Sequence, residues 1–197
     1  MSQNVGRNDQ QSLSDDEMAQ LLTLLGKVDG NKPLGTPLFN AISPIVVQPA
    51  VEAVWLRVAR FLPDVTAPTT CHHRVEVYLT QRSVNDTAYP GQRHCPGSIV
   101  RKGEEIDDTF ARLAKKEFCT RLKQYQFVRN FNNPHEERGH FLSQIYLCEF
   151  DESERYQNGQ WWTVDCLPEN TILHHREIII PAAVGIFKAD HATELLS

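Results

Sequence analysis

The sequence predicts an α+β fold, specifically an α/β/α sandwich in which a mixed sheet lies between helices. Residues 74–81 alternate between apolar and polar side chains, which is the pattern of a half-buried strand. Residues 104–118 instead repeat their apolar side chains with the spacing of an amphipathic helix. The candidate elements follow the order β-β-α-β-β-α, which does not have the strict alternation of a doubly wound parallel sheet.

The length, net charge and apolar content of the chain limit the classes of protein to which it can belong. The chain has 197 residues, enough for one domain with a full core and an extra terminal element. A net charge of -5 argues against a dedicated nucleic-acid binder. There is neither an apolar run long enough to span a membrane nor a signal peptide at the N-terminus, so we expect no membrane partner and a cytoplasmic location.

The five cysteines do not form a recognisable pattern. Their number is odd and no C-x-x-C pair occurs, which favours reduced thiols over a disulfide framework or a zinc site. Cys119 and Cys148 lie in apolar surroundings, and we expect both in the core.

The chain divides into three expected regions, a disordered tail (1–12), an N-terminal helical extension (13–44) and the main domain (45–197). Ser14 and Glu17 have the spacing of a capping box, which predicts a helix from Asp15 to about Lys27. This added helix either packs on the main domain or forms a contact in a homodimer.

The main domain begins with two predicted strands. Val54, Leu56 and Val58 alternate with other residues and indicate a strand over 51–61, the expected antiparallel partner of 74–81. Further strands are expected at Tyr125–Asn130, Phe141–Phe150 and Trp161–Val164. A C-terminal helix is expected within 171–188, where Pro181 interrupts it or begins its second part.

The predicted helix at 104–118 has acidic residues in its first turn and lysines near its end, which matches the helix dipole. A glycine turn at Pro96-Gly97-Ser98 precedes it. Together these residues resemble the signature box of the Nudix family, in which a glycine turn leads to a glutamate and then to an Arg-Glu and a Glu-Glu pair. Glu104 matches the first glutamate, Arg112 the arginine and Glu117 the last glutamate.

Two flanking segments extend the resemblance to roughly residues 50–190. Gln81-Arg82 ends the preceding strand as Lys-Arg commonly does in the family, and residues 162–168 are similar to a late Trp-to-Leu-Pro segment. The resemblance implies a mixed sheet between helices and a divalent metal, Mg²⁺ or Mn²⁺, held against a diphosphate. It also implies hydrolysis of a nucleotide-type small molecule, a nucleoside diphosphate linked to another moiety.

The box departs from the family pattern where metal-binding carboxylates are expected. Leu113 replaces the glutamate after the arginine, Lys116 replaces the first glutamate of the pair, and Cys119 replaces the following glycine. Because Mg²⁺ prefers oxygen ligands that include carboxylates, the resemblance implies a reduced metal site. The pattern Arg112-Leu113 with a single later glutamate is nearest to the branch of GDP-mannose mannosyl hydrolase.

The resemblance assigns metal ligands by position. These are the carbonyl of Gly97, the carboxylate of Glu117 and Gln157 in a late loop. The mannosyl hydrolase branch uses a histidine beside that glutamine as the base. No histidine follows Gln157 here, so Glu154 or Glu152 is the candidate base.

Four further residues are candidates at the site. Arg82 at a strand end suits phosphate binding, and Trp161 suits stacking on a base. Glu104 and Arg112 are candidate catalytic residues, with the alternative that they form a structural charge pair that orients the loop on the helix. Two functions therefore remain open, a Nudix-type hydrolase and an inactive module that binds a nucleotide or a protein partner.

Overall fold

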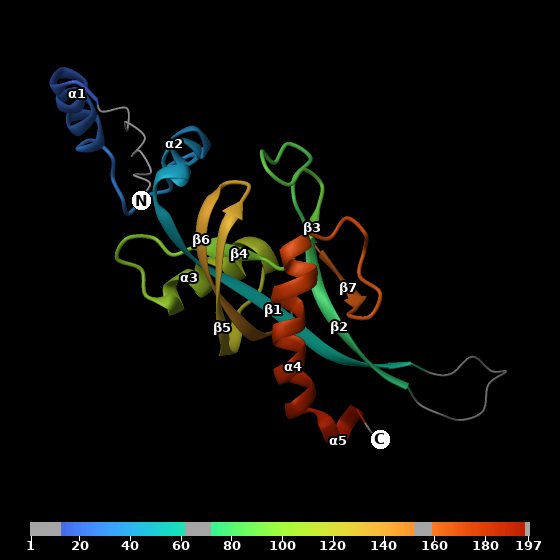
Figure 1. Cartoon of the computed structure of the whole chain (residues 1–197). Coiled ribbons are helices and arrows are strands. Elements are labelled where there is room, and N and C mark those ends of the chain that lie inside the picture. Colours follow the sequence, from blue (N-terminus) through green and yellow to red (C-terminus); the bar gives the residue numbers. More distant parts are fainter. Residues whose placement is uncertain (1–12, 62–71, 152–158, 196–197) are drawn as a thin grey trace, which may run out of the picture.

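The computed structural model describes residues 13–61, 72–151 and 159–195, which form the predicted α/β/α sandwich (Figure 1). Within these ranges seven strands make one mixed sheet, in the order β3-β2-β1-β6-β5, with β4 on β1 and β7 on β2. The strands are β1 (Val47–Phe61), β2 (His72–Gln81), β3 (Arg93–His94), β4 (Gly97–Ile99), β5 (Leu122–Glu136), β6 (Gly139–Phe150) and β7 (Gly159–Thr163). The helices are α1 (Asp15–Leu25), α2 (Thr36–Ile42), α3 (Ile106–Leu113), α4 (Ile180–Asp190) and α5 (Ala192–Leu195).

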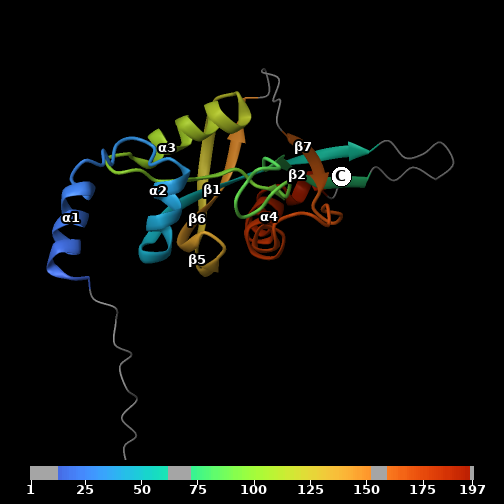
Figure 2. The ribbon, with the colours of Figure 1, turned by 90° about the horizontal axis from the view of Figure 1, so that it is seen from above.

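Strand β1 is the centre of the sheet. It pairs antiparallel with β2, as predicted, and also with β4, and it runs parallel to β6. Val51 and Trp55 lie in the core cluster that contains α3, whereas Val54 and Leu56 lie in the cluster that contains α4. Alternate side chains of one strand therefore supply both cores. Seen from above, α3 and α4 cover opposite faces of the sheet (Figure 2).

The helix predicted at 104–118 is confirmed as α3 followed by a π-helical segment, η2 (Ala114–Phe118). The Asp108 carboxylate accepts a hydrogen bond from the backbone N–H of Glu105 at 3.1 Å, which satisfies one donor of the first turn. Cys119 ends the segment in the left-handed conformation with φ of 54°. Its expected core position is wrong, because this capping position leaves it exposed, while Cys148 is buried as expected.

The N-terminal helix and its capping box are confirmed. Glu17 accepts from the backbone N–H of Ser14 at 2.8 Å, and Ser14 Oγ accepts from the N–H of Glu17 at 3.4 Å. None of the residues of α1 is buried, and the helix points away from the sandwich (Figure 1). The sequence did not predict α2, which begins after Gly35 at a φ of 73° and has Pro37 in its first turn. Residues 1–12 lie outside the described residues.

The remaining strands are confirmed but run longer than expected, because β5 and β6 form an extended antiparallel pair with three register shifts. Pro181 lies at the start of α4, as one of the two predicted alternatives requires, and the π-helical segment η3 (His175–Ile179) precedes it. The short strands β3 and β4 were not predicted. Among the described helices, none has the length and apolar character that a membrane crossing requires.

Candidate functional site

A cavity of about 560 Å³ lies on one face of β1. Gln48, Ala50 and Glu52 alternate along the strand and line this cavity, and the next two alternate positions continue into the core under α4. Six basic side chains and two carboxylates line the same space: Lys32, Arg82, Arg101, Lys102, Arg112, Arg138, Glu52 and Glu136. The excess of positive charge suits an anionic ligand.

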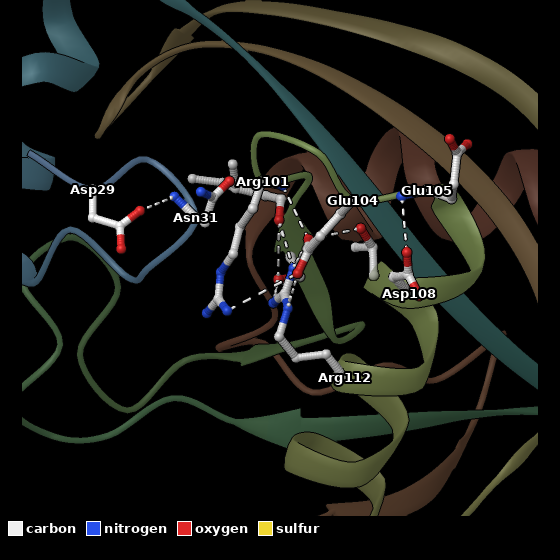
Figure 3. A network of polar contacts seen from close by, with 10 residues as sticks. Asp29, Asn31, Arg101, Glu104, Glu105, Asp108 and Arg112 are labelled. Atoms are coloured by element: carbon white, nitrogen blue, oxygen red, sulfur yellow. Dashed lines mark hydrogen bonds and ion pairs between the residues drawn. The ribbon is translucent and has the colours of Figure 1, made fainter.

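Arg112 lines this cavity and binds Glu104, which does not line it. Arg112 donates from Nε to Glu104 Oε1 at 2.8 Å and from Nη2 to Glu104 Oε2 at 2.6 Å (Figure 3). It also donates to Ser98 Oγ at 2.6 Å and to the carbonyl of Ile99 at 3.0 Å. These hydrogen bonds from Arg112 are the main cause that lowers the pKa of Glu104 to about 2. The geometry is that of the structural charge pair, which ties the loop after β4 to α3.

Glu52 is a residue of the cavity that the sequence prediction missed. Its partner in the β1–β4 pairing is Gly97, and a Cβ at Gly97 would collide with the Glu52 carboxylate. Ser143 Oγ donates to Glu52 at 3.1 Å. Burial raises the pKa of Glu52 to about 7, against the opposing charge of Arg82. The available signal was a carboxylate within the otherwise apolar run 49–56, which is unusual without a partner or a role.

Arg82 reaches the cavity from the end of β2, as predicted. The Asp86 carboxylate lies 3.8 Å from Arg82 and forms a shorter ion pair with Arg138. Backbone N–H groups of Ala88 and Tyr89 donate to the same Asp86 oxygen at 3.0 Å each. Burial, and then the charge of Arg138, lower the pKa of Arg82. One fixed carboxylate therefore holds two guanidinium groups at the cavity, an arrangement suited to phosphate oxygens.

Histidines border the cavity beside these arginines. His174 and His175 line it, and burial followed by the charge of Arg82 lowers the pKa of His174 to about 4. This imidazole is therefore neutral at physiological pH and adds no positive charge to the cavity. His94 is buried nearby, with Nε2 at 3.2 Å from Thr80 Oγ1.

Leu113 and Lys116 contribute no carboxylate to a metal site, and their side chains lie in different surroundings. Leu113 is 2% exposed and packs in the core, and Lys116 Nζ lies 2.9 Å from Glu117 Oε1. Within ranges 13–61, 72–151 and 159–195, no group of three or more His, Cys, Asp or Glu residues has the placement of a metal site. The predicted ligand Gln157 and the predicted base Glu154 lie outside the described residues.

Glu117 and Trp161 stand apart from the residues that line the cavity. The charge of Glu117 acts on Arg82, which places its carboxylate within electrostatic range of the cavity. Trp161 packs its ring against Trp55 and Tyr78, with centroid distances of 4.9 and 5.4 Å, and the Arg57 guanidinium covers it at 4.2 Å. The partly buried ring of Trp161 packs against the core cluster around Trp55, and base stacking by Trp161 remains a prediction.

Known proteins resemble this chain in fold. No family model and no curated protein sequence matches it. A mutT/nudix family protein from Listeria innocua is similar in structure, with a TM-score of 0.53, 15% identity, and coverage of 78% of this chain and 99% of that one. UDP-X diphosphatase has a TM-score of 0.53 and 13% identity, with coverage of 91% and 73%.

A MutT NUDIX hydrolase from Burkholderia pseudomallei has a TM-score of 0.50 and 17% identity, and the match covers 66% of this chain and 94% of that one. The likeness to these structures shows that the chain has the Nudix fold, which confirms the predicted fold class. At such identities the likeness concerns the fold alone, and function depends on the residues of the site.

Proposed function

We propose that this Nudix-fold protein binds a nucleoside diphosphate, or a nucleoside diphosphate linked to another moiety, in the cavity beside β1. The observation that carries the proposal is the cavity lining, in which six basic side chains surround two carboxylates. Arg82 and Arg138 share the Asp86 carboxylate, so both guanidinium groups are oriented before a ligand arrives. Such preorganisation lowers the cost of ordering side chains on binding.

The size of the cavity agrees with this ligand class. A volume of about 560 Å³ is within the range of sites that enclose small organic molecules. Phe141 and Tyr89 supply apolar and aromatic surface beside the charged groups. A ligand that combines a diphosphate with a nucleoside would use both kinds of surface.

A titration of wild-type protein with ADP and UDP by isothermal calorimetry tests the proposal. We expect Arg82→Ala to weaken binding about tenfold or more, because a charge-assisted hydrogen bond to phosphate contributes roughly 1.5–3 kcal/mol. Arg121→Ala is the matched control, since Arg121 is an exposed arginine that does not line this cavity. Equal affinities for the two variants would contradict the proposal.

Hydrolysis of the bound ligand is the second candidate function. Two carboxylates, Glu52 and Glu136, line the cavity near the basic groups, and a carboxylate beside a bound phosphate is placed to accept a proton from water. A solved structure with the same fold is that of UDP-X diphosphatase, which supports the candidate by analogy of fold only. Leu113 and Lys116 instead favour binding without turnover.

A turnover assay distinguishes hydrolysis of the bound ligand from binding without turnover. Release of the nucleoside monophosphate together with the sugar phosphate (ribose 5-phosphate from ADP-ribose, glucose 1-phosphate from UDP-glucose) would be measured with Mg²⁺, with Mn²⁺ and with EDTA. Metal-dependent release that Glu117→Gln abolishes supports hydrolysis and a metal role for Glu117. Binding without release in all three conditions supports the binding module.

A further inference from the structure

The N-terminal extension forms one wall of the cavity. Lys32, Leu34 and Phe39 are among its residues that line the space, although they precede the first strand of the sheet. The helix α1 itself contributes none of the lining residues. The segment between α1 and α2, together with the start of α2, is therefore the part of the extension that meets the site.

Contacts hold this segment against the loop that precedes α3. Gly30 lies so close to Lys102 that a Cβ would stand 3.3 Å from Lys102 Cδ. Asn31 Oδ1 would be 3.7 Å from a Cβ on Gly103, which adopts a φ of 77°. Asn31 donates from its backbone N–H to Asp29 at 3.0 Å (Figure 3). A compact turn of the extension thus packs on the loop that Glu104 and Arg112 stabilise.

The other end of the segment is fixed to the sheet. Ser43, just after α2, is buried and accepts a short hydrogen bond from Gln48 of β1. Gly139, the first residue of β6, passes so close to the carbonyl of Ser43 that a side chain at 139 would collide with it. The extension is therefore anchored on both sides of the cavity.

The residues that this wall presents are of two kinds. The Lys32 side chain is 77% exposed, and its pair with Asp29 at 3.4 Å is an exposed ion pair of small net energy, which an incoming phosphate can replace. Lys32 shares the cavity with Lys102 of the facing loop. Phe39 and Leu34 are half-buried and add apolar surface beside Phe141 of β6. The wall thus offers the cation of Lys32 and the apolar surface of Leu34 and Phe39.

We propose that the N-terminal extension is a specificity-determining part of the ligand site, in which Lys32 binds a phosphate group and Phe39 packs against the nucleoside. This inference rests on the proposed function, because it concerns the same cavity. It assigns the segment 29–39, which the sequence placed in the N-terminal helical extension, to ligand recognition.

Calorimetric titrations of the full chain with ADP and with inorganic pyrophosphate test the inference. We expect Phe39→Ala to weaken ADP binding roughly tenfold, as loss of a base–aromatic contact does, and to leave pyrophosphate binding unchanged. Lys32→Ala should weaken both ligands about threefold to tenfold, because it removes one phosphate contact. Matched controls are Leu38→Ala on the same helix and Lys27→Ala, neither of which lines the cavity.

The outcomes separate this inference from the proposed function. If the wild type binds ADP, and if Phe39→Ala and Lys32→Ala bind it with the same affinity as their controls, the role of the extension is overturned. The proposed site itself is then unaffected. Wild type that binds neither probe contradicts the proposed function and this inference with it. Thermal melting of each variant accompanies the titrations, and Phe39→Leu serves if Phe39→Ala unfolds, since it keeps apolar volume but removes the ring. Unchanged ADP affinity in a folded Phe39→Leu also overturns the role of the ring.

Discussion

Glu104 and Glu52 are two carboxylates beside arginines, on opposite sides of the glycine turn at Gly97, yet their surroundings differ. Glu104 accepts hydrogen bonds from the guanidinium of Arg112 and from the backbone of Arg101, and its pKa falls to about 2. Glu52 accepts one from Ser143 and has a pKa raised to about 7 by burial. Glu104 accepts hydrogen bonds from several donors, whereas Glu52 lines the cavity and can accept further hydrogen bonds.

This difference distinguishes the carboxylate that ties the loop before α3 to the helix from the carboxylate that remains available in the cavity. Glu104 and Arg112 neutralise each other's charge in a close ion pair. The cavity around Glu52 and Arg82 keeps charged groups that a ligand can use. A family match at Glu104 therefore predicts the loop geometry and does not by itself predict catalysis.

The largest expected effect is the loss of the Glu104 network. Arg112→Ala removes the closest ion-pair partner of the Glu104 carboxylate, leaving Arg101 at 4.0 Å, and removes hydrogen bonds to Ser98 and Ile99, so we expect it to lower the free energy of unfolding by about 3 kcal/mol. Urea denaturation measures this. Arg101→Ala is the control, because its side chain lies 4.0 Å from Glu104 and a weak pair of this kind contributes less than about 1 kcal/mol. Equal losses in the two variants would show that Arg112 has no special role.

The two carboxylates should give stability opposite dependences on pH. The folded pKa of Glu104 lies below its unfolded value, so its contribution is present above about pH 4.5 and is lost as pH falls towards 2. The folded pKa of Glu52 lies above its unfolded value, so stability decreases as pH rises from about 4.5 through 7.

Glu52→Gln removes the loss of stability that ionisation of Glu52 causes, and it keeps an oxygen that accepts the hydrogen bond from Ser143. We expect the variant to be more stable than wild type by about 2 kcal/mol at pH 8 and equal to it at pH 4. Unfolding curves at the two pH values measure this difference. A variant that gains nothing at pH 8 would mean that Glu52 is ionised without cost in the folded protein.

A smaller effect is expected at Gly97, where the backbone of β4 must approach Glu52. Gly97→Ala places a methyl group against the Glu52 carboxylate and 3.0 Å from the carbonyl of Val51, and overpacking of this kind costs about 1–3 kcal/mol. Combining it with Glu52→Ala should recover part of the loss, leaving the clash with Val51. Strict additivity of the two substitutions in a double-mutant cycle would contradict the contact.

The smallest effect is expected at Glu117, whose carboxylate pairs with an exposed lysine. Glu117→Gln should change stability by less than about 0.5 kcal/mol, as most substitutions at such sites do. Glu104→Gln in the same denaturation series provides the contrast. A large loss for Glu117→Gln would show that the last turn before Cys119 carries a structural role like that of Glu104.

The sequence predicted the sandwich because its periodic signals are long. The apolar stripe of α3 covers about two helical turns, and the alternation of β2 covers most of a ten-residue strand. Each pattern matches a face that is buried in the structure. Strands β3 and β4 are too short for such a signal, and α2, with seven residues, spans only about two turns. Their existence depends on tertiary contacts, among them the approach of Gly97 to Glu52.

The candidate site was predictable only in part. Arg82 was placed correctly at the cavity because it ends a strand beside the glycine turn. Glu52, Arg138 and Phe39 come from segments far apart in sequence, and only the parallel pairing of β1 with β6 and the path of the extension bring them together. Leu113 and Lys116 were identified from the sequence as departures from the box pattern; in the structure Leu113 is buried in the core and the Lys116 side chain is exposed.

The location of the ligand is the most direct test of the central claim that the cavity beside β1 is the binding site. In a two-dimensional ¹⁵N NMR titration with ADP, we expect shifts to concentrate at backbone amides that line the cavity, including Gly35, Ser98 and Ser143. A separate hollow beside α3, lined by Ala111, Arg121 and Tyr125, serves as the internal reference and should not respond. Shifts confined to that hollow, or none at saturating ADP, would contradict the account.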